Sequence, residues 1–456
     1  MIVMKFGGTS VESASAIERV ASIVKARIER RPVVVVSAMG KTTNKLVAIA
    51  KCAGEGQREE AQRQIDELCA FHLREVEAVV SKADWPEAQR TVRSHFRLLL
   101  ELVQELCAAG EVSPRSLDSI LSFGERVSSA VVALAFRNFG MESVHVDARH
   151  VVITDSHHTQ AAPIYRLTYE RLARIVTPLG REKVVVMGGF IGANESGTTT
   201  TLGRGGSDFS ASLAGAGIGA EEIQIWTDVD GMLTVDPTIL PGGHRVKSIS
   251  FAEAAELAYF GAKVLHPATV LPAIEKNIPV LILNSRRPQA EGTRIIAEAV
   301  ACANVIKSIA CKRKITVLNI HSTRMLMAHG FLRRIFEVFD RHETPVDVVS
   351  TSEVSVSLTI DNTARLADIC QELRQFSEVE TEGDRAIICL VGDNIRYTAG
   401  VAGRAFGALG EVNIRMISQG ASRLNLSFVV AGQDLPRAVE LLHAEFFREL
   451  DPAVFD

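Results

Sequence analysis

The stretch from Lys183 to Ser212 constrains the fold of this chain more than any other segment. It starts with an apolar run, Val184–Met187, and continues through a Gly-Gly-Phe turn and four threonines. A glycine-rich turn, Gly203–Asp208, then opens an Ala-rich segment. The apolar run is typical of a buried strand. The Ala-rich segment is typical of a helix with Ser207 or Asp208 near its N-terminus, so the stretch predicts a strand–turn–helix unit.

The glycine-rich turn is suited to bind an anion. Glycines before a helix let the backbone approach a ligand closely, and the free N–H groups at the helix start favour negative charge. Arg204, inside the turn, adds a planar guanidinium that matches a carboxylate or a phosphate. We therefore expect an anion site of a phosphate-handling enzyme here, with phosphate as the first candidate.

The N-terminal residues predict a second unit of this kind. Ile2–Phe6 is apolar apart from Lys5, a Gly-Gly-Thr-Ser turn and a helical pattern follow, and Val33–Val36 is the next predicted strand. This βαβ order indicates an α/β fold, with a mostly parallel sheet between helical layers. A buried lysine needs a partner, so Lys5 is a candidate for binding phosphate, although a simple turn remains the alternative for the tetrapeptide after it.

The next segments alternate in the same way. A charged helical region from 46 to about 106, with a break at Trp85-Pro86, is predicted to cover the sheet. A further helix is expected to begin at Ser122, which puts Glu125 in or just before its first turn. Glu125 then either complements the helix dipole at the surface or receives an ammonium group. Further strands are predicted at 144–146, 223–228 and 279–283.

The C-terminal third has a different, repeated pattern of strand, helix, strand and strand. The first copy comprises residues 315–320, 330–341, 346–349 and 354–360, and the second comprises 386–391, 401–409, 414–417 and 424–430. Two such copies predict paired small α+β modules. The chain is therefore expected to divide near residues 295–305.

Composition narrows the function further. A length of 456 residues suggests two or three domains. The net charge of −4 does not favour nucleic acid or an anionic membrane as a partner. No apolar run approaches the roughly 20 residues of a spanning helix, and no charged segment typical of a signal peptide precedes the first strand. Seven scattered cysteines without a CxxC pair indicate reduced thiols in a cytoplasmic protein.

Six motifs in chain order resemble those of the aspartate kinases. They are Lys5–Ser10, Ser122–Glu125, Gly188–Gly192, Thr199–Asp208, Trp226–Asp228 and Phe260–Pro267. The resemblance covers nearly the whole chain, includes two C-terminal ACT modules, and is nearest to the lysine-sensitive, monofunctional type, aspartokinase III. It implies an amino-acid-kinase fold over residues 1–297, a first ACT domain over 314–384, and a second ACT domain built from 298–313 plus 385–450.

The resemblance implies a reaction and its partners. ATP, with Mg²⁺ on its phosphate oxygens, would phosphorylate the β-carboxylate of L-aspartate to give 4-phospho-L-aspartate, the first step towards lysine, threonine and methionine. An amino-acid effector, expected to be lysine, would inhibit the enzyme through the ACT domains. These domains would also form a homodimer, and a tetramer is the other assembly that we consider.

Roles for individual residues follow from the same resemblance. The catalytic residues would be Lys5 and Asp208. The substrate-binding residues would be Thr43, Glu125, Phe190, Arg204 and Ser207. The ATP-binding residues would be Lys5, Gly7, Gly8, Thr227, Asp228, Leu233, Lys263 and Val264. The effector-binding residues would be Met325, Ala328, Gly330, Phe331, Leu332, Asp347 and Ser352. No protein residues are assigned to a metal site, although Asp208 or Asp228 could assist Mg²⁺.

The sequence also departs from the family pattern. Leu233 and Thr238 stand where many relatives carry a tyrosine and an arginine, so another cation must contact the phosphate or ATP must bind differently. Ala328 replaces a polar residue of the effector site. For Asp347, expected to face an effector's ammonium group, a solvated strand-end carboxylate is the alternative.

Two other functions remain as alternatives. The substrate could be glutamate or acetylglutamate, but Glu125 together with Arg204 argues against the acetylated one, whose amino group carries no charge. The chain could also be an amino-acid sensor without catalysis. The presence of Lys5, Arg204 and Asp208 argues against a sensor, which has no need for a phosphate-binding lysine.

Overall fold

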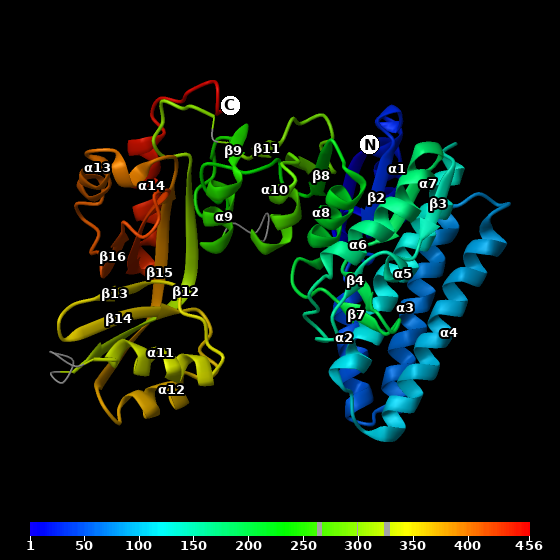
Figure 1. Ribbon diagram of the computed structural model, residues 1–456, viewed down its shortest axis with the longest axis horizontal. Helices are drawn as coiled ribbons and strands as arrows, with labels where there is room; N and C mark the ends of the chain where they lie inside the picture. The colour runs from blue at the N-terminus through cyan, green and yellow to red at the C-terminus, as the bar shows by residue number, and fades with distance from the viewer. Residues whose placement is uncertain (262–266, 299, 323–328) are drawn as a thin grey trace. The chain divides into compact units, whose positions relative to one another are not determined.

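The computed structural model describes residues 1–261, 267–298, 300–322 and 329–456. The chain divides into two compact units (Figure 1). Unit 1 comprises Met1–Met232 and Leu265–Glu298, and unit 2 comprises Leu233–Val264 and Ala299–Asp456. The division thus passes between Glu298 and Ala299, inside the range predicted for a boundary, and it also assigns the segment 233–264 to unit 2.

Unit 1 contains the parallel sheet that the βαβ pattern predicts. The strands, in spatial order, are β3 (Ser143–Val146), β5 (Val184–Gly188), β2 (Pro32–Val36), β1 (Ile2–Phe6), β8 (Glu222–Thr227), β10 (Val280–Asn284) and β11 (Thr293–Ile296). All neighbours pair in parallel except β10 and β11. Every residue of β1, β2 and β5 is buried, as expected for central strands that helices cover on both faces.

Helices surround this sheet and supply most of the core. They are α1 (Ala14–Lys25), α2 (Thr42–Gly54), α3 (Arg58–Val79), α4 (Trp85–Ala109), α5 (Pro114–Asn138), α6 (Tyr165–Arg171), α7 (Thr177–Glu182), α8 (Gly206–Ile218) and α10 (Leu271–Glu275). One hydrophobic cluster joins α1 to α5 with β1, β2 and β5, and α3, α4 and α5 run side by side (Figure 1). The predicted break at Trp85-Pro86 is the start of α4, because Pro86 suits a first helical turn.

The predicted start of the helix around Glu125 is wrong. Helix α5 begins at Pro114, where the Ser113 side chain accepts a hydrogen bond from the N–H of Ser116. This Ser-Pro start is a strong N-terminal signal that the prediction overlooked. Glu125 consequently lies in the middle of α5 with 3% of its surface exposed, which excludes a surface glutamate that complements the helix dipole.

Unit 1 also contains a small second sheet. It has the strand order β4 (Ile153–Thr154), β6 (Ile191–Asn194) and β7 (Thr199–Thr201). β6 and β7 pair antiparallel, so the threonine run returns along the strand that follows the Gly-Gly-Phe turn. The chain then passes directly from β7 into the glycine-rich turn and α8.

Unit 2 contains the predicted pair of α+β modules. Its sheet has the order β13 (Val349–Thr351), β14 (Ser355–Ile360), β12 (Ser308–His321), β15 (Glu378–Val391), β17 (Asn425–Ala431) and β16 (Met416–Gln419). Its helices are α9 (Phe251–Tyr259), α11 (Phe331–Arg341), α12 (Leu366–Leu373), α13 (Val401–Ala408) and α14 (Leu435–Phe446), and the short strand β9 is Ser248–Ser250. The repeat prediction is confirmed, except that the strand expected at 346–349 begins at Val349.

Two long antiparallel strands join the modules. β12 and β15 have 14 residues each, and their pairing changes register around Lys314, which has a φ of 59°. Residues 308–313 of β12 pair with 386–391 of β15, whose other edge pairs with β17. Residues 316–321 of β12 pair with β14 on one edge and with the first part of β15 on the other. Each module is therefore completed by a strand that continues into the other one.

Helix α5 is long and apolar enough to cross a membrane by length and composition. However, 89% of its apolar window is buried by the rest of the protein, and it packs against the sheet through residues of the main hydrophobic cluster. In this structure the apolar surface of α5 is thus used for the core of unit 1.

A buried histidine should make unit 1 sensitive to acid. His72 on α3 is fully buried; its Nδ1 contacts the Leu68 carbonyl at 2.8 Å, and its Nε2 has no partner in the described residues. Burial lowers the pKa of His72 from 6.5 to about 4. The unfolded chain binds the proton more tightly, so stability is full above pH 6.5 and is lost as pH falls towards 4.

We predict that this group alone removes about 2 kcal/mol of stability between pH 7 and pH 5. The measurement is urea unfolding of the wild type and of His72→Phe at both pH values. Phe is chosen because the site lies beside Phe71 and Phe96. The variant should lose less stability than the wild type over this interval. Equal losses in the two proteins would contradict the prediction.

Candidate active site

A pocket of about 410 Å³ lies at the carboxyl ends of the central strands of unit 1. It is lined by Lys5, Gly8, Ser37, Ala38, Gly40, Lys41, Thr43, Asn44, Glu125, Phe190, Gly203, Gly205, Gly206, Ser207 and Asp208. Parallel sheets bind ligands at this edge. The pocket brings together the N-terminal turn, the middle of α5 and the glycine-rich turn, which are far apart in the sequence.

Lys5 is held by a carboxylate in this pocket. Its Nζ lies 2.7 Å from Oδ1 of Asp208 in the first turn of α8, and both side chains are largely buried. The sequence predicted a partner for Lys5 and suggested phosphate. The structure pairs it with Asp208, so one cation and one anion lie together where the two predicted anion-binding turns meet.

Glu125 lines the same pocket with a buried carboxyl that is only partly hydrogen-bonded. Its Oε1 accepts a hydrogen bond of 3.1 Å from the backbone N–H of Ala38, while Oε2 is buried and has no partner within the described residues. Burial raises the pKa of this carboxyl to about 8. A buried carboxyl of this kind is suited to receive a cationic group, which would supply the missing partner.

The glycine-rich turn adopts a conformation that requires its glycines. Gly203 and Gly205 have φ values of 74° and 72°, a region that side chains rarely adopt. The Ser207 side chain, at the start of α8, accepts a hydrogen bond of 3.0 Å from Ser37. Arg204 is exposed and has no ion pair with any residue that the structure describes, so its guanidinium is available to a ligand beside the pocket.

The residues predicted to bind ATP lie in several places. Gly8 lines the pocket, whereas the N–H of Gly7 is already bonded to the Trp226 carbonyl at 3.3 Å. Thr227 ends β8 and donates to Asp228, which is exposed. Leu233 belongs to unit 2, and Lys263 and Val264 lie outside the described residues.

Asp347, the central residue of the predicted effector site, is paired inside unit 2. The Lys312 ammonium lies 2.6 Å from its Oδ1 and 2.8 Å from Oδ2 of Asp361. The Asp347 side chain is only 5% exposed, its Oδ2 has no partner among the described residues, and burial raises its pKa. The interpretation of Asp347 as a solvated strand-end carboxylate is therefore wrong.

The other predicted effector residues surround the start of α11 and a turn. Gly330, with a φ of 79°, precedes α11; Phe331 is buried and Leu332 is half-exposed. Ser352 is exposed, and its N–H bonds to the Ser355 carbonyl. Met325 and Ala328 lie outside the described residues.

Sequence reasoning missed two residues that bond to predicted site residues and one further buried carboxylate. Ser37 bonds to Ser207, and Lys312 bonds to Asp347. Asp118 is a buried carboxylate on the same helix as Glu125. A seven-residue spacing on one helix was the available signal for Asp118, because it places the two side chains on one face. No group of three His, Cys, Asp or Glu side chains suited to a metal ion occurs within the described residues.

Comparisons with known proteins agree on the family of both parts of the chain. A family model described as the amino acid kinase family matches residues 1–284, and one described as an ACT domain matches residues 388–446. The lysine-sensitive aspartokinase 3 of Escherichia coli strain K12 is 37% identical over 457 residues, which cover 98% of this chain and 99% of that protein.

Two solved structures of the E. coli aspartokinase III are also similar to this one. The complex with aspartate and ADP, in the R-state, has a TM-score of 0.83 at 37% identity and covers 98% of this chain and all of that chain (100%). The complex with lysine and aspartate, in the T-state, has a TM-score of 0.85 at 36% identity and covers 98% of this chain and 99% of that chain.

The state of Glu125 leads to a prediction about ligand binding. At pH 7 a carboxyl with a pKa of about 8 is mostly protonated, and an ammonium group that binds to it favours the ionised form. Binding of an amino acid should therefore release about one proton per site at pH 7, and less above pH 9. Titration calorimetry in buffers of different ionisation enthalpy measures this number.

The matched variant is Glu125→Gln, which has a similar shape and no titratable proton. It should bind the amino acid more weakly and release no proton. A binding heat of the wild type that is the same in all buffers at pH 7 would contradict the role of Glu125.

Proposed function

The chain belongs to the aspartokinases of the amino acid kinase family, the ATP-dependent aspartate kinases, and we propose how its own residues carry out their reaction. Aspartate kinases transfer the γ-phosphoryl group of ATP to the β-carboxylate of L-aspartate. The product, 4-phospho-L-aspartate, leads to lysine, threonine and methionine. The observation that carries the proposal is a single pocket that combines a paired lysine, Lys5, with a buried and unsatisfied carboxyl, Glu125.

Glu125 and Arg204 orient the aspartate. The buried Oε2 of Glu125 receives the α-ammonium group, which supplies the hydrogen-bond partner that this oxygen lacks. Arg204 binds the α-carboxylate with its planar fork of donors. Thr43, Phe190 and Ser207 line the same pocket as Glu125. The anion of the glycine-rich turn is then the substrate carboxylate, and the turn brings aspartate to the phosphate.

Lys5 acts on the phosphoryl group. The β-carboxylate of aspartate is already ionised at pH 7, since its reference pKa is about 3.9, so no general base is needed. Catalysis then depends on position and on neutralisation of the charge on the transferring group. The Lys5 ammonium, held by Asp208 at 2.7 Å, supplies this positive charge in the pocket that Lys5 and Gly8 both line.

ATP and Mg²⁺ complete this proposal. Thr227 and Asp228 at the end of β8, with Leu233, Lys263 and Val264, would hold the nucleotide. Mg²⁺ needs only one or two carboxylates in addition to phosphate oxygens, which fits a pocket with Asp208 and no cluster of acidic side chains in its described part. When bound, the ion neutralises phosphate charge. Asp208 keeps Lys5 in position whether or not it also assists the ion.

Lysine is the effector that we propose for the first ACT module. A relative in the same family carries the name lysine-sensitive aspartokinase, and its structure with lysine is similar to this one. The free Oδ2 of Asp347 supports this proposal, because it remains as an acceptor while Lys312 occupies Oδ1. We also propose that the chain assembles through its ACT domains, as a homodimer or a tetramer. A cytoplasmic location is part of the same proposal and is in line with the seven free cysteines.

The substrate is tested by trapping the acyl phosphate. We predict that the protein with MgATP and hydroxylamine gives the hydroxamate of L-aspartate and no comparable signal with L-glutamate or N-acetyl-L-glutamate. N-acetyl-L-aspartate is the matched control, since its uncharged nitrogen offers no ammonium to Glu125. A signal with glutamate alone would indicate a different kinase, and no signal with any acceptor would indicate a sensor.

Effector binding is tested at Asp347. We predict that Asp347→Asn raises the lysine concentration for half-inhibition about ten-fold or more, as loss of a buried charge pair does, and leaves activity without lysine unchanged. Asp361→Asn is the control, since this residue contacts Lys312 but is 41% exposed. Inhibition of Asp347→Asn at wild-type lysine concentrations would contradict the proposed effector site.

A further inference from the structure

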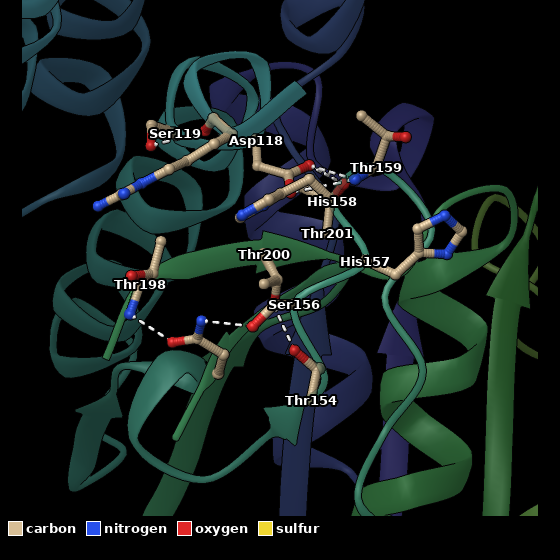
Figure 2. A network of polar contacts seen from close by, with 12 residues as sticks. Asp118, Ser119, Thr154, Ser156, His157, His158, Thr159, Thr198, Thr200 and Thr201 are labelled. Atoms are coloured by element: carbon tan, nitrogen blue, oxygen red, sulfur yellow. Dashed lines mark hydrogen bonds and ion pairs between the residues drawn. The ribbon is translucent and has the colours of Figure 1, made fainter. Parts of the chain in front are cut away.

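A second buried carboxylate lies on α5 and has no role in the chemistry described above. Asp118 is fully buried and accepts four hydrogen bonds from two segments outside the helix (Figure 2). Its Oδ2 lies 2.7 Å from Nδ1 of His158, and its Oδ1 accepts from the Thr201 hydroxyl at 2.5 Å. The N–H of Thr159 lies 3.1 Å from both oxygens.

One of these partners has a strained backbone. Thr159 has a φ of 71°, which is rare for a β-branched residue and costs of order 1–3 kcal/mol. Such a conformation persists only where its surroundings hold it, and the two hydrogen bonds from its N–H to Asp118 do so. Strain of this kind occurs often at functional sites, which directs attention to what Thr159 contacts.

Thr159 and Thr201 are both adjacent to the glycine-rich turn, Thr159 in space and Thr201 in the sequence. A side-chain carbon on Gly203 would lie 3.2 Å from the Thr159 carbonyl, so the loop packs directly against this glycine. Thr201 is followed by Leu202, whose N–H bonds to the Phe190 carbonyl at 2.9 Å. Gly203 comes next and lines the pocket. Asp118 therefore fixes both the loop beside the turn and the strand that enters it.

We propose that Asp118 is a positioning residue for the aspartate substrate. Through Thr159 and Thr201 it sets the position of the turn that carries Arg204, and hence of the guanidinium that binds the α-carboxylate. This inference rests on the proposed function, since it assigns Arg204 to the substrate. The hydrogen bonds of Asp118 go to His158, Thr159 and Thr201 and not to Lys5 or Asp208, so loss of these bonds should affect the binding of aspartate more than that of MgATP.

A neighbouring pair of hydroxyls provides an internal comparison. Thr154 and Thr200, both fully buried, bond to each other at 2.7 Å in the same small sheet (Figure 2). This pair joins β4 and β7, and Thr154 also donates to the carbonyl of the adjacent Asp155 at 2.8 Å, but neither threonine side chain bonds to Thr159 or to Asp118. Loss of the pair should weaken the sheet without moving the turn, whereas loss of the Asp118 bonds should move it.

The test compares Michaelis constants for the two substrates. Asn in place of Asp118 keeps the shape but turns one acceptor into a donor that faces other donors. Asp118→Asn should raise KM for aspartate roughly ten-fold or more, as a displacement of about 1 Å in a binding group does, and leave KM for MgATP within about two-fold. Thr201→Val should act in the same direction, and Thr201→Ser, which keeps the hydroxyl, should have the wild-type KM.

Thr200→Val is the matched control. It should lower the thermal midpoint and leave both KM values unchanged. If Asp118→Asn and Thr201→Val lower the thermal midpoint but leave KM for aspartate unchanged, the network is only structural and the proposal is overturned. If Asp118→Asn does not fold, the KM for aspartate of Thr201→Val is compared with that of Thr201→Ser, and equal values overturn the proposal. A wild type that forms no aspartyl hydroxamate would instead refute the proposed function.

Discussion

The ion pair between Lys5 and Asp208 is the interaction on which the rest of the site depends. A lysine within a buried strand is costly without a partner, and removal of one partner of a buried pair typically costs about 3–5 kcal/mol. For the carboxylate to reach β1, α8 must begin close to the sheet. A side-chain carbon on Gly189 would lie 2.7 Å from that of Ser207. The Gly-Gly-Phe turn therefore needs a glycine at this position for the start of α8 to lie so close to the sheet.

Helix α5 carries two buried carboxylates whose surroundings give them different roles. Asp118 accepts four hydrogen bonds and has no capacity left for a ligand. Glu125, about two turns further along the same face, accepts one hydrogen bond and leaves an oxygen unsatisfied in the pocket. Asp118, whose oxygens are fully hydrogen-bonded, stabilises the loop and the strand beside the glycine-rich turn. Glu125, which has an oxygen without a partner in the described part of the chain, is available to bind an ammonium group. Asp347 in unit 2 resembles Glu125 in this respect, because only one of its two carboxylate oxygens has a partner among the described residues.

Local sequence patterns predicted those strands and helices that depend on hydrophobic runs and on glycine-rich turns. The valine runs became buried strands, and the Gly203–Asp208 turn opens a helix as expected. The partners of buried charges were not predictable in this way. Lys5 pairs with Asp208, and Asp347 pairs with Lys312, through contacts between distant segments. The role of Asp118 depends on a loop and a strand that no periodicity connects to its helix.

The central claim is that Lys5 supplies the positive charge for phosphoryl transfer. The most direct measurement is the turnover of Lys5→Ala in the hydroxylamine assay, with Lys25→Ala, an exposed lysine of α1, as the control. The account predicts that Lys5→Ala loses roughly 10²–10³-fold in kcat, while lysine binding to unit 2 persists and Lys25→Ala is unaffected. Turnover of Lys5→Ala at the wild-type rate would contradict the account.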